Sequence, residues 1–223
     1  HVGSWNFAAT AYLNRWKVKI YYEHYFDDHS QMFFQYGRWK DGHIGLEITF
    51  PKNRFIDTFV YEGLGTKDQT GPMLYDSFWG EFEEQISAKD NYYNHYLYQG
   101  WQHWGMGIGN PLLPGPIYNK NGQITFISNR VLAHHIGFCG SPCQSLSYRM
   151  LLSYSRHWGT YDNPLNEIKK QFNSLFEVTY APQQLKGWSF TVSGAMDRGS
   201  ILGNNYGGML VIRKQGIIKS GNK

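Results

Sequence analysis

The segment WKVKIYYEHYF, residues 16–26, decides the fold because its side chains alternate between apolar and polar. The apolar face carries Trp16, Val18, Ile20 and Tyr22, and the other face carries Lys17, Lys19, Tyr21 and Glu23. A period of two places successive side chains on opposite faces of a β-strand, whereas an amphipathic helix needs a period of 3.6. The segment is therefore predicted to be a strand with one apolar and one polar face.

The same alternation recurs in eight further segments of the chain. They are residues 5–11, 44–50, 54–64, 130–139, 146–155, 172–180, 188–196 and 207–214. Residues 54–64 follow the pattern less regularly than the others. His134 and His135 are expected on opposite faces of their strand, so they are not expected to share a metal ion. The sequence predicts an all-β chain of about nine strands.

The connections between these strands alternate in length. Short turns are expected at residues 14–16, 51–54, 140–144 and 181–187, and long connections at residues 27–42, 65–129 and 157–170, with a moderate one at residues 198–205. Short turns on one side and long loops on the other are typical of an antiparallel up-and-down meander whose two rims meet different environments.

The apolar faces carry aromatic side chains near the strand ends, where the aromatic girdles of outer-membrane barrels lie. These side chains are Trp16, Tyr22, Phe50, Tyr148, Tyr154, Tyr180 and Trp188. The pattern predicts an antiparallel up-and-down outer-membrane β-barrel. A soluble β-sandwich with one solvated face shows the same alternation and stays open as an alternative. Since an antiparallel barrel closes with an even number of strands, nine strands suggest half of a barrel of about eighteen.

Composition excludes several other classes of protein. The 223 residues carry a net charge of +4 with dispersed Lys and Arg, so no nucleic-acid-binding surface is expected. No run of 18 apolar residues predicts a transmembrane helix. The start, HVGSWNFAAT, has no initiator Met or leader, so a processed product or a piece of a longer protein is expected. Cys139 and Cys143 can form a disulfide across a turn or remain free thiols, and both possibilities stay open.

Six long segments resemble a known family. They are YYEHYFDDHSQMFFQYGRWKDG, FPKNRF, YEGLGTKDQTGP, YNHYLYQGWQHWGMGIGNPLL, SYSRHWGTYDNP and MDRGSILGNNYGGMLVIRK, which together span nearly the whole chain. The chain resembles the C-terminal half of the capsule assembly Wzi family proteins of Bacteroidetes-type bacteria. The resemblance implies a bacterial outer-membrane barrel of about eighteen strands that associates with capsular polysaccharide as a lectin. It implies that residues 1–223 form the C-terminal part of a single barrel domain, and that other envelope proteins are possible partners.

The long connection at residues 65–129 is rich in aromatic side chains, and two roles for them are open. Flat rings there can stack on sugar rings while polar neighbours bind hydroxyl groups. The glycan-binding candidates are Trp101, Trp104, Tyr96, Tyr98, His103 and Tyr118, in the company of Tyr92 and Tyr93. Alternatively the connection folds inward as a plug and its rings form its own core, since a loop of this length is ordered by packing or is disordered.

No motif in the sequence argues for an enzyme, a metal site or a cofactor. The acidic residues 81–85 are sequence neighbours without a second acid placed opposite them, as a glycosidase would need. The glycines of residues 105–109 follow no predicted strand and precede Pro111, so they do not predict a phosphate-binding loop.

The sequence therefore predicts a non-enzymatic outer-membrane β-barrel that binds or organises capsular or surface polysaccharide, with membrane lipid around it. The alternatives are an outer-membrane channel or transport component with a loop-constricted lumen, and a soluble carbohydrate-active enzyme.

Overall fold

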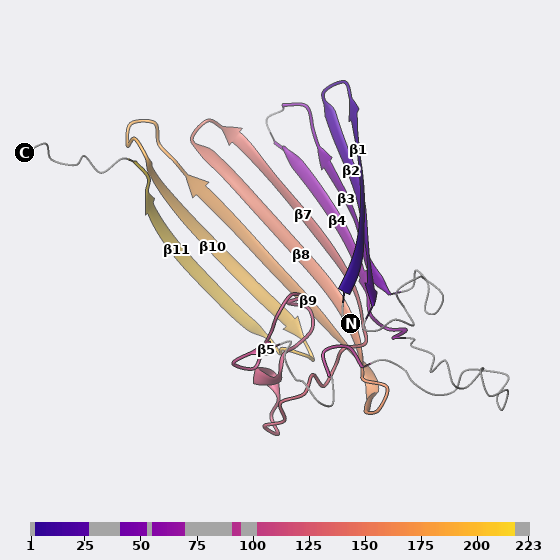
Figure 1. Cartoon of the computed structure of the whole chain (residues 1–223). Coiled ribbons are helices and arrows are strands. Elements are labelled where there is room, and N and C mark those ends of the chain that lie inside the picture. Colours follow the sequence, from indigo (N-terminus) through magenta and orange to yellow (C-terminus); the bar gives the residue numbers. More distant parts are fainter. Residues whose placement is uncertain (1–2, 27–40, 53–54, 70–90, 95–101, 217–223) are drawn as a thin grey trace, which may run out of the picture.

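A computed structural model describes residues 3–26, 41–52, 55–69, 91–94 and 102–216 of the chain. Nine strands form one antiparallel sheet (Figure 1). Each of these nine strands pairs with the strand or strands next to it in the sheet order. They are β1 Gly3–Leu13, β2 Trp16–Phe26, β3 Gly42–Thr49, β4 Thr58–Gly65, β7 Val131–Cys143, β8 Leu146–Gly159, β9 Pro164–Tyr180, β10 Trp188–Gly199 and β11 Asn205–Lys214. The prediction of an all-β antiparallel meander of about nine strands is confirmed. Three short elements, β5 Gln102–His103, β6 Met106–Gly107 and the 3₁₀ helix η2 Pro116–Tyr118, lie between β4 and β7.

The strand register divides the side chains of the sheet between two chemically distinct faces. On the apolar face, Ile20 of β2 lies opposite Leu46 of β3. On the polar face, Glu62 of β4 lies opposite His135 of β7. Because each pairing keeps residues of the same kind opposite one another, the alternation read from single strands continues across the whole sheet.

Large side chains on the apolar face remain exposed to the surroundings. Ile20 is 54% exposed, Val192 60% and Leu210 66%. In the part of the chain that the structure describes, neither a second large sheet nor a helix packs against this face. A soluble β-sandwich would bury these side chains against its other sheet, so the described residues do not form one.

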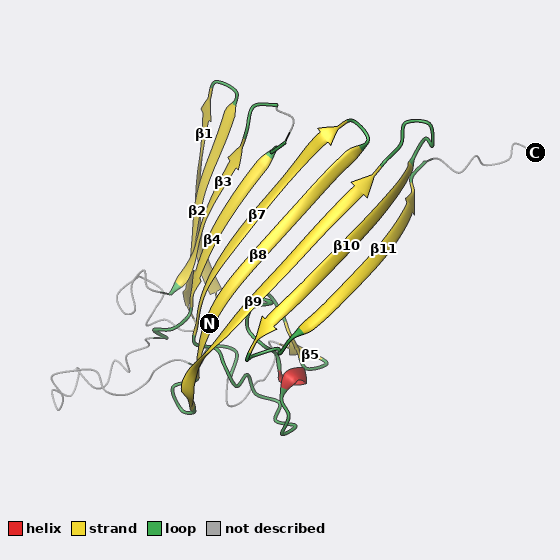
Figure 2. Ribbon diagram, turned by 180° about the vertical axis from the view of Figure 1, so that it is seen from behind, coloured by secondary structure: helices red, strands yellow, loops and turns green. Residues whose placement is uncertain are grey.

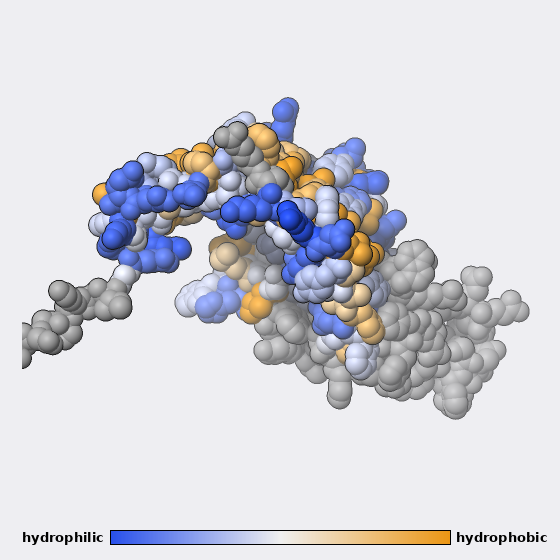
Figure 3. Space-filling view, turned by 90° about the horizontal axis from the view of Figure 1, so that it is seen from above, coloured by the Kyte–Doolittle hydropathy of each residue, from blue (hydrophilic) through white to orange (hydrophobic). Residues whose placement is uncertain are grey.

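The sheet is curved and open. It forms an arch when seen along the strands (Figure 3), and Figures 1 and 2 show the segment between β4 and β7 on its concave side, at the end that carries the long connections. β1 and β11 form the two edges, and they run in the same direction because the seven strands between them alternate in direction. The described residues thus form a curved sheet without closure, and the predicted barrel is not seen in them.

The buried apolar core is small and lies where the concave face meets the β4–β7 connection. Its side chains are Leu64, Leu113, Phe126, Val131 and Ala133. Leu64 and Ala133 belong to the polar face of the sheet, and Leu113 and Phe126 belong to the connection. The described residues therefore pack their interior against the polar face and leave the apolar face uncovered.

The prediction of a long connection at residues 157–170 is wrong. β8 continues to Gly159 and β9 begins at Pro164, so residues 157–170 contain only a four-residue turn. The turn is closed by the backbone N–H of Asn163, which donates to Thr160 Oγ1 at 2.9 Å. The alternation of side chains did not predict the start of β9, because polar side chains occupy both of its faces there.

Two smaller expectations concern the cysteines and transmembrane helices. Cys139 and Cys143 are free thiols, and a register shift between Gly140 and Cys143 marks the end of β7. Within the described ranges, no helix is both long and apolar enough to cross a membrane.

Candidate functional site

The described residues of the long connection, 91–94 and 102–129, are here called the plug segment. They are fixed to the rim of the sheet by polar side chains, beginning with Asp41. Asp41 is 3% exposed, and its carboxylate accepts hydrogen bonds from the backbone N–H groups of Asp68 at 2.9 Å and Gln69 at 2.5 Å. The hydroxyl of Tyr92 donates to the same carboxylate at 3.0 Å. One buried acid thereby joins the entry to β3, the end of β4 and the plug segment.

Asn129 forms a second anchor at the other end of the plug segment. Its side-chain amide donates to Asn91 Oδ1 at 2.6 Å and to the carbonyl oxygen of Tyr92 at 2.7 Å. Its own carbonyl oxygen accepts from the hydroxyl of Thr66 at 2.7 Å and from Gln69 Nε2 at 2.9 Å. Buried polar groups need partners, and here they are satisfied largely by side chains from the rim and the plug segment.

The two parts of the plug segment are also joined to each other. The side-chain amide of Asn94 donates to the carbonyl oxygen of Phe126 at 2.7 Å, and Asn94 Oδ1 accepts from the backbone N–H of Phe126 at 2.8 Å. The rings of Tyr93 and Phe126 pack with their centroids 4.8 Å apart. Tyr92 and Tyr93 therefore serve as packing side chains, as the alternative plug interpretation expects.

Burial shifts two ionisable groups at these anchors. It raises the pKa of the Asp41 carboxyl above its ordinary value, although the hydrogen bonds from Asp68, Gln69 and Tyr92 act in the opposite direction. It also raises the pKa of the Tyr93 hydroxyl. Both shifts follow from the removal of water around a group whose charged form needs solvation.

Trp104 occupies the tip of a hairpin that projects from the plug segment. β5 and β6 pair as Gln102 with Gly107 and His103 with Met106, which leaves Trp104 and Gly105 as a two-residue turn. Their φ angles are 53° and 77°. Gly adopts such a conformation freely, whereas a bulky side chain is rare there. Trp104 is nevertheless 85% exposed, so it gains little from packing in return.

Three of the six glycan-binding candidates lie in the described residues and share one small unit. His103 precedes Trp104, and their ring centroids are 6.3 Å apart. The backbone N–H of Ile117 donates to the carbonyl oxygen of Gly105 at 2.8 Å, which ties η2, and with it Tyr118, to the hairpin. Tyr118 is 55% exposed. The other three candidates, Trp101, Tyr96 and Tyr98, lie outside the described residues.

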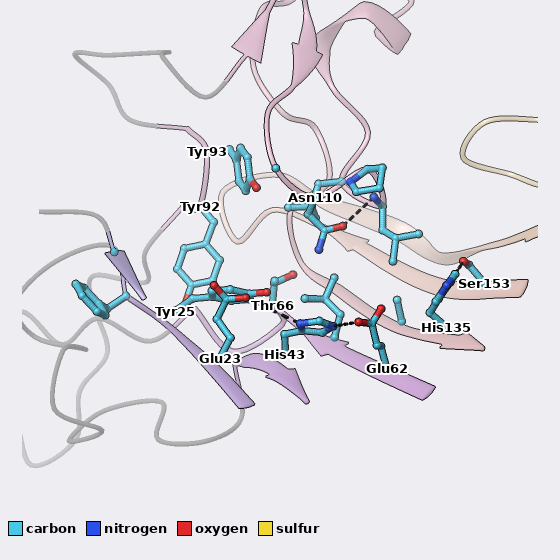
Figure 4. A pocket seen from close by; sticks show the side chains of 18 residues that line it. Glu23, Tyr25, His43, Glu62, Thr66, Tyr92, Tyr93, Asn110, His135 and Ser153 are labelled. Atoms are coloured by element: carbon cyan, nitrogen blue, oxygen red, sulfur yellow. Dashed lines mark hydrogen bonds and ion pairs between the residues drawn. The ribbon is translucent and has the colours of Figure 1, made fainter. Parts of the chain in front are cut away.

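A pocket of about 660 Å³ lies between the plug segment and the polar face of the sheet (Figure 4). On the sheet side it is lined by Glu23, His43, Glu62, His135 and Ser153. On the plug side it is lined by Tyr92, Tyr93 and residues 109–113. The strand period in the sequence assigned Glu23 to the polar face of β2. The sequence did not reveal that β3, β4 and β7 place the other pocket side chains beside Glu23.

Histidine 43 stands between the two carboxylates of the pocket. His43 Nε2 lies 3.5 Å from Glu62 Oε1, and His43 Nδ1 lies 3.9 Å from Glu23 Oε2. His135 points into the same pocket and bonds Ser153 Oγ at 2.6 Å. Its neighbour His134 lies on the opposite face and bonds the hydroxyl of Tyr61 at 2.8 Å, as the strand period predicts.

Two candidate sites remain, the acidic residues 81–85 and a metal site. The acidic residues 81–85 lie outside the described residues. Among the residues that are described, no group of three or more His, Cys, Asp and Glu side chains is arranged to hold a metal ion. The chain matches no family model, no curated protein and no solved structure.

Proposed function

We propose that the chain is the C-terminal half of an outer-membrane β-barrel of the capsule assembly Wzi type, which binds or organises surface polysaccharide without enzymatic activity. Two independent features support this proposal. The first is the distribution of side chains over the sheet, and the second is the exposed aromatic side chain at the tip of the plug segment.

The uncovered apolar face favours a bilayer as its surroundings. Side chains such as Val192 and Ile212, at 60% and 58% exposed, lie on the face that a barrel turns toward lipid. The polar face is concave and holds the plug segment, as the lumen side of a barrel does. A water-exposed apolar area of this extent is unusual for a soluble monomer, and a membrane is the surrounding that fits it best.

The open edges favour a barrel made from more strands than these nine. Among the described residues, β1 and β11 each pair with a strand on one side, and strands at the edge of a sheet are prone to pair with other strands. They run in the same direction, so direct closure would join them in parallel. An odd number of additional antiparallel strands would close the sheet with antiparallel pairs throughout, and nine more give the eighteen that we propose.

Trp104 is the observation that carries the binding proposal. Its left-handed backbone conformation costs about 1 kcal/mol or more, and its ring, which is 85% exposed, gives little packing energy in return. A structural role offers no reason for a tryptophan at this turn. A flat ring that stacks on the apolar face of a sugar does offer one, and such ring contacts contribute about 0.5–1.5 kcal/mol.

The test is Trp104→Ala in the purified full-length protein, with the capsular polysaccharide of the producing cell as the ligand. We expect affinity to fall about threefold to tenfold, since each 1.4 kcal/mol corresponds to tenfold. The thermal unfolding midpoint is expected to stay unchanged, because the ring is 85% exposed and alanine keeps the same left-handed backbone conformation. Surface plasmon resonance and thermal unfolding measure the two quantities.

The matched control is Tyr12→Ala. Tyr12 is 75% exposed near the opposite rim and lies far along the sheet from the plug segment. It should leave polysaccharide affinity unchanged. If Trp104→Ala binds as tightly as the wild type and loses thermal stability instead, the ring is a packing element and the binding proposal is wrong.

A further inference from the structure

The pocket beneath the plug segment is separate from the residues proposed above for the polymer. Trp104, His103 and Tyr118 do not line it. Its volume of about 660 Å³ is within the range of small-molecule sites, and it leaves room for a monosaccharide with some water. The pocket is therefore large enough to be a second binding site.

The side chains that line the pocket carry mainly negative charge. Glu23 and Glu62 supply two carboxylates, and none of the described residues that line the pocket is Lys or Arg. The nearest basic side chain along β2, Lys19, lies over the ring of Tyr21 at 5.3 Å and does not line the pocket. Within the described part of the lining, only the imidazoles of His43 and His135 can balance the two carboxylates, so this lining favours a positive ligand and disfavours an anion.

The two carboxylates are held in place by neighbouring side chains. Ser4 Oγ donates to Glu23 Oε1 at 2.8 Å, and the hydroxyl of Tyr21 donates to Glu62 Oε1. Tyr21 reaches Glu62 across Gly45 of the intervening strand, where a Cβ atom would lie 2.0 Å from the Tyr21 ring. A carboxylate has four acceptor positions, so each of these groups keeps acceptor capacity for a ligand. Their side chains remain 31% and 30% exposed.

The opposite wall of the pocket has the character of a sugar-binding surface. Tyr92 and Tyr93 lie above the carboxylates in Figure 4, with Asn110 beside them. Leu112 and Leu113 add apolar contact area. Aromatic and aliphatic side chains suit the C–H faces of a sugar ring, while Asn110 and Ser153 can bond hydroxyl groups at its edge.

We propose that this pocket binds a saccharide unit that carries a free, protonated amino group. The ammonium group binds the remaining acceptor positions of Glu23 and Glu62 on the pocket side of His43, and the sugar ring packs beneath the tyrosines of the plug segment. The saccharide part rests on the proposed function, whereas the preference for a cation rests on the pocket alone.

The experiment is isothermal titration calorimetry of the full-length protein in detergent micelles at pH 7 with four probes. Glucosamine is expected to bind, since it combines the ring with the ammonium group. N-acetylglucosamine and glucuronate, which lack the positive charge or carry a negative one, are expected to bind at least about tenfold more weakly. Ethanolamine, which carries the amine without the ring, is also expected to bind more weakly.

Two isosteric variants locate the site. Glu62→Gln and Glu23→Gln keep an oxygen that accepts the hydrogen bond of Tyr21 or Ser4 but remove the charge. Each is expected to weaken glucosamine binding about tenfold or more, because hydrogen bonds between charged groups are the strong ones. Glu47→Gln is the matched control, since Glu47 pairs with Lys17 at 3.6 Å on the same face outside the pocket, and it should bind glucosamine as the wild type does.

The outcomes separate this proposal from the proposed function. Equal affinity for glucosamine and N-acetylglucosamine, equal affinity for ethanolamine, or no effect of either pocket variant would overturn it. Trp104→Ala should leave glucosamine binding unchanged. If the polymer fails to bind while glucosamine binds through Glu23 and Glu62, the polysaccharide function is wrong and the pocket stands. If the polymer binds and glucosamine does not, the pocket proposal alone is wrong.

Discussion

Asp41 illustrates how one residue can hold a large insertion in place. Three donors from separate parts of the chain, Asp68, Gln69 and Tyr92, converge on its carboxylate. Its burial raises the pKa of the carboxyl above the ordinary value of 3.8 despite these donors. The ionised form is therefore harder to accommodate in the folded protein than in the unfolded chain.

This shift predicts the pH dependence of stability. A group whose folded pKa exceeds its unfolded pKa contributes stability that is complete below the unfolded value and is lost as the pH rises through the folded value. The contribution of Asp41 should thus be complete below pH 3.8 and decline as the pH rises above it. Urea unfolding in detergent micelles between pH 3.5 and about 7 measures the slope.

Asp41→Asn removes the titrating group and serves as the comparison. The difference in unfolding free energy between the wild type and Asp41→Asn should shift with pH in favour of the variant as the pH rises. A difference that stays constant over this interval would show that Asp41 has the same pKa in the folded and unfolded states.

At the scale of elements, two amide side chains hold the two parts of the plug segment together. Asn94 and Asn129 each make two hydrogen bonds across the segment at 2.6–2.8 Å. A buried donor or acceptor that loses its partner costs about 1–3 kcal/mol. These two side chains therefore join residues 102–129 to residues 91–94, which bond Asp41 at the rim through Tyr92.

We expect the double variant Asn94→Ala/Asn129→Ala to release the plug segment. The conductance of the full-length protein in planar lipid bilayers should rise from a low value, and protease cleavage within residues 102–129 should become faster. Gln183→Ala is the control, since it removes an exposed amide hydrogen bond to Gln144 near the opposite rim. High conductance in the wild type would instead support the channel alternative.

At the scale of the whole molecule, the two faces of the sheet should respond oppositely to charge. Val192 and Ala195 both lie in β10, on the apolar and the polar face respectively. An arginine that faces lipid near the bilayer midplane costs about 2–4 kcal/mol, whereas an arginine in a wet lumen costs little.

Val192→Arg should lower the unfolding free energy in lipid vesicles by about 2–4 kcal/mol and reduce recovery in the outer-membrane fraction. Ala195→Arg should change both quantities little. If the two variants behave alike, or if Ala195→Arg is the more damaging one, the apolar face does not meet lipid and the membrane proposal is wrong.

The strands and their faces could be predicted from the sequence because they depend on local information. A period of two along the chain is enough to show that Ile20 and Glu23 lie on opposite faces, whatever strands lie beside them. The order of the sheet also followed, since short turns force neighbouring strands to pair. The start of β9 was missed because residues such as Asn166 and Lys169 remove the alternation on which that inference depends.

The contents of the concave side were decided only by the tertiary structure. His43, Glu62 and His135 come from three strands, and their meeting with Tyr93 depends on how the chain between β4 and β7 folds back. Likewise, the sequence left the roles of Tyr93 and Trp104 open, and the structure packs the half-buried ring of Tyr93 against Phe126 while it exposes Trp104. Contacts between distant residues depend on the balance of burial and hydrogen bonding over the whole molecule, which no local period encodes.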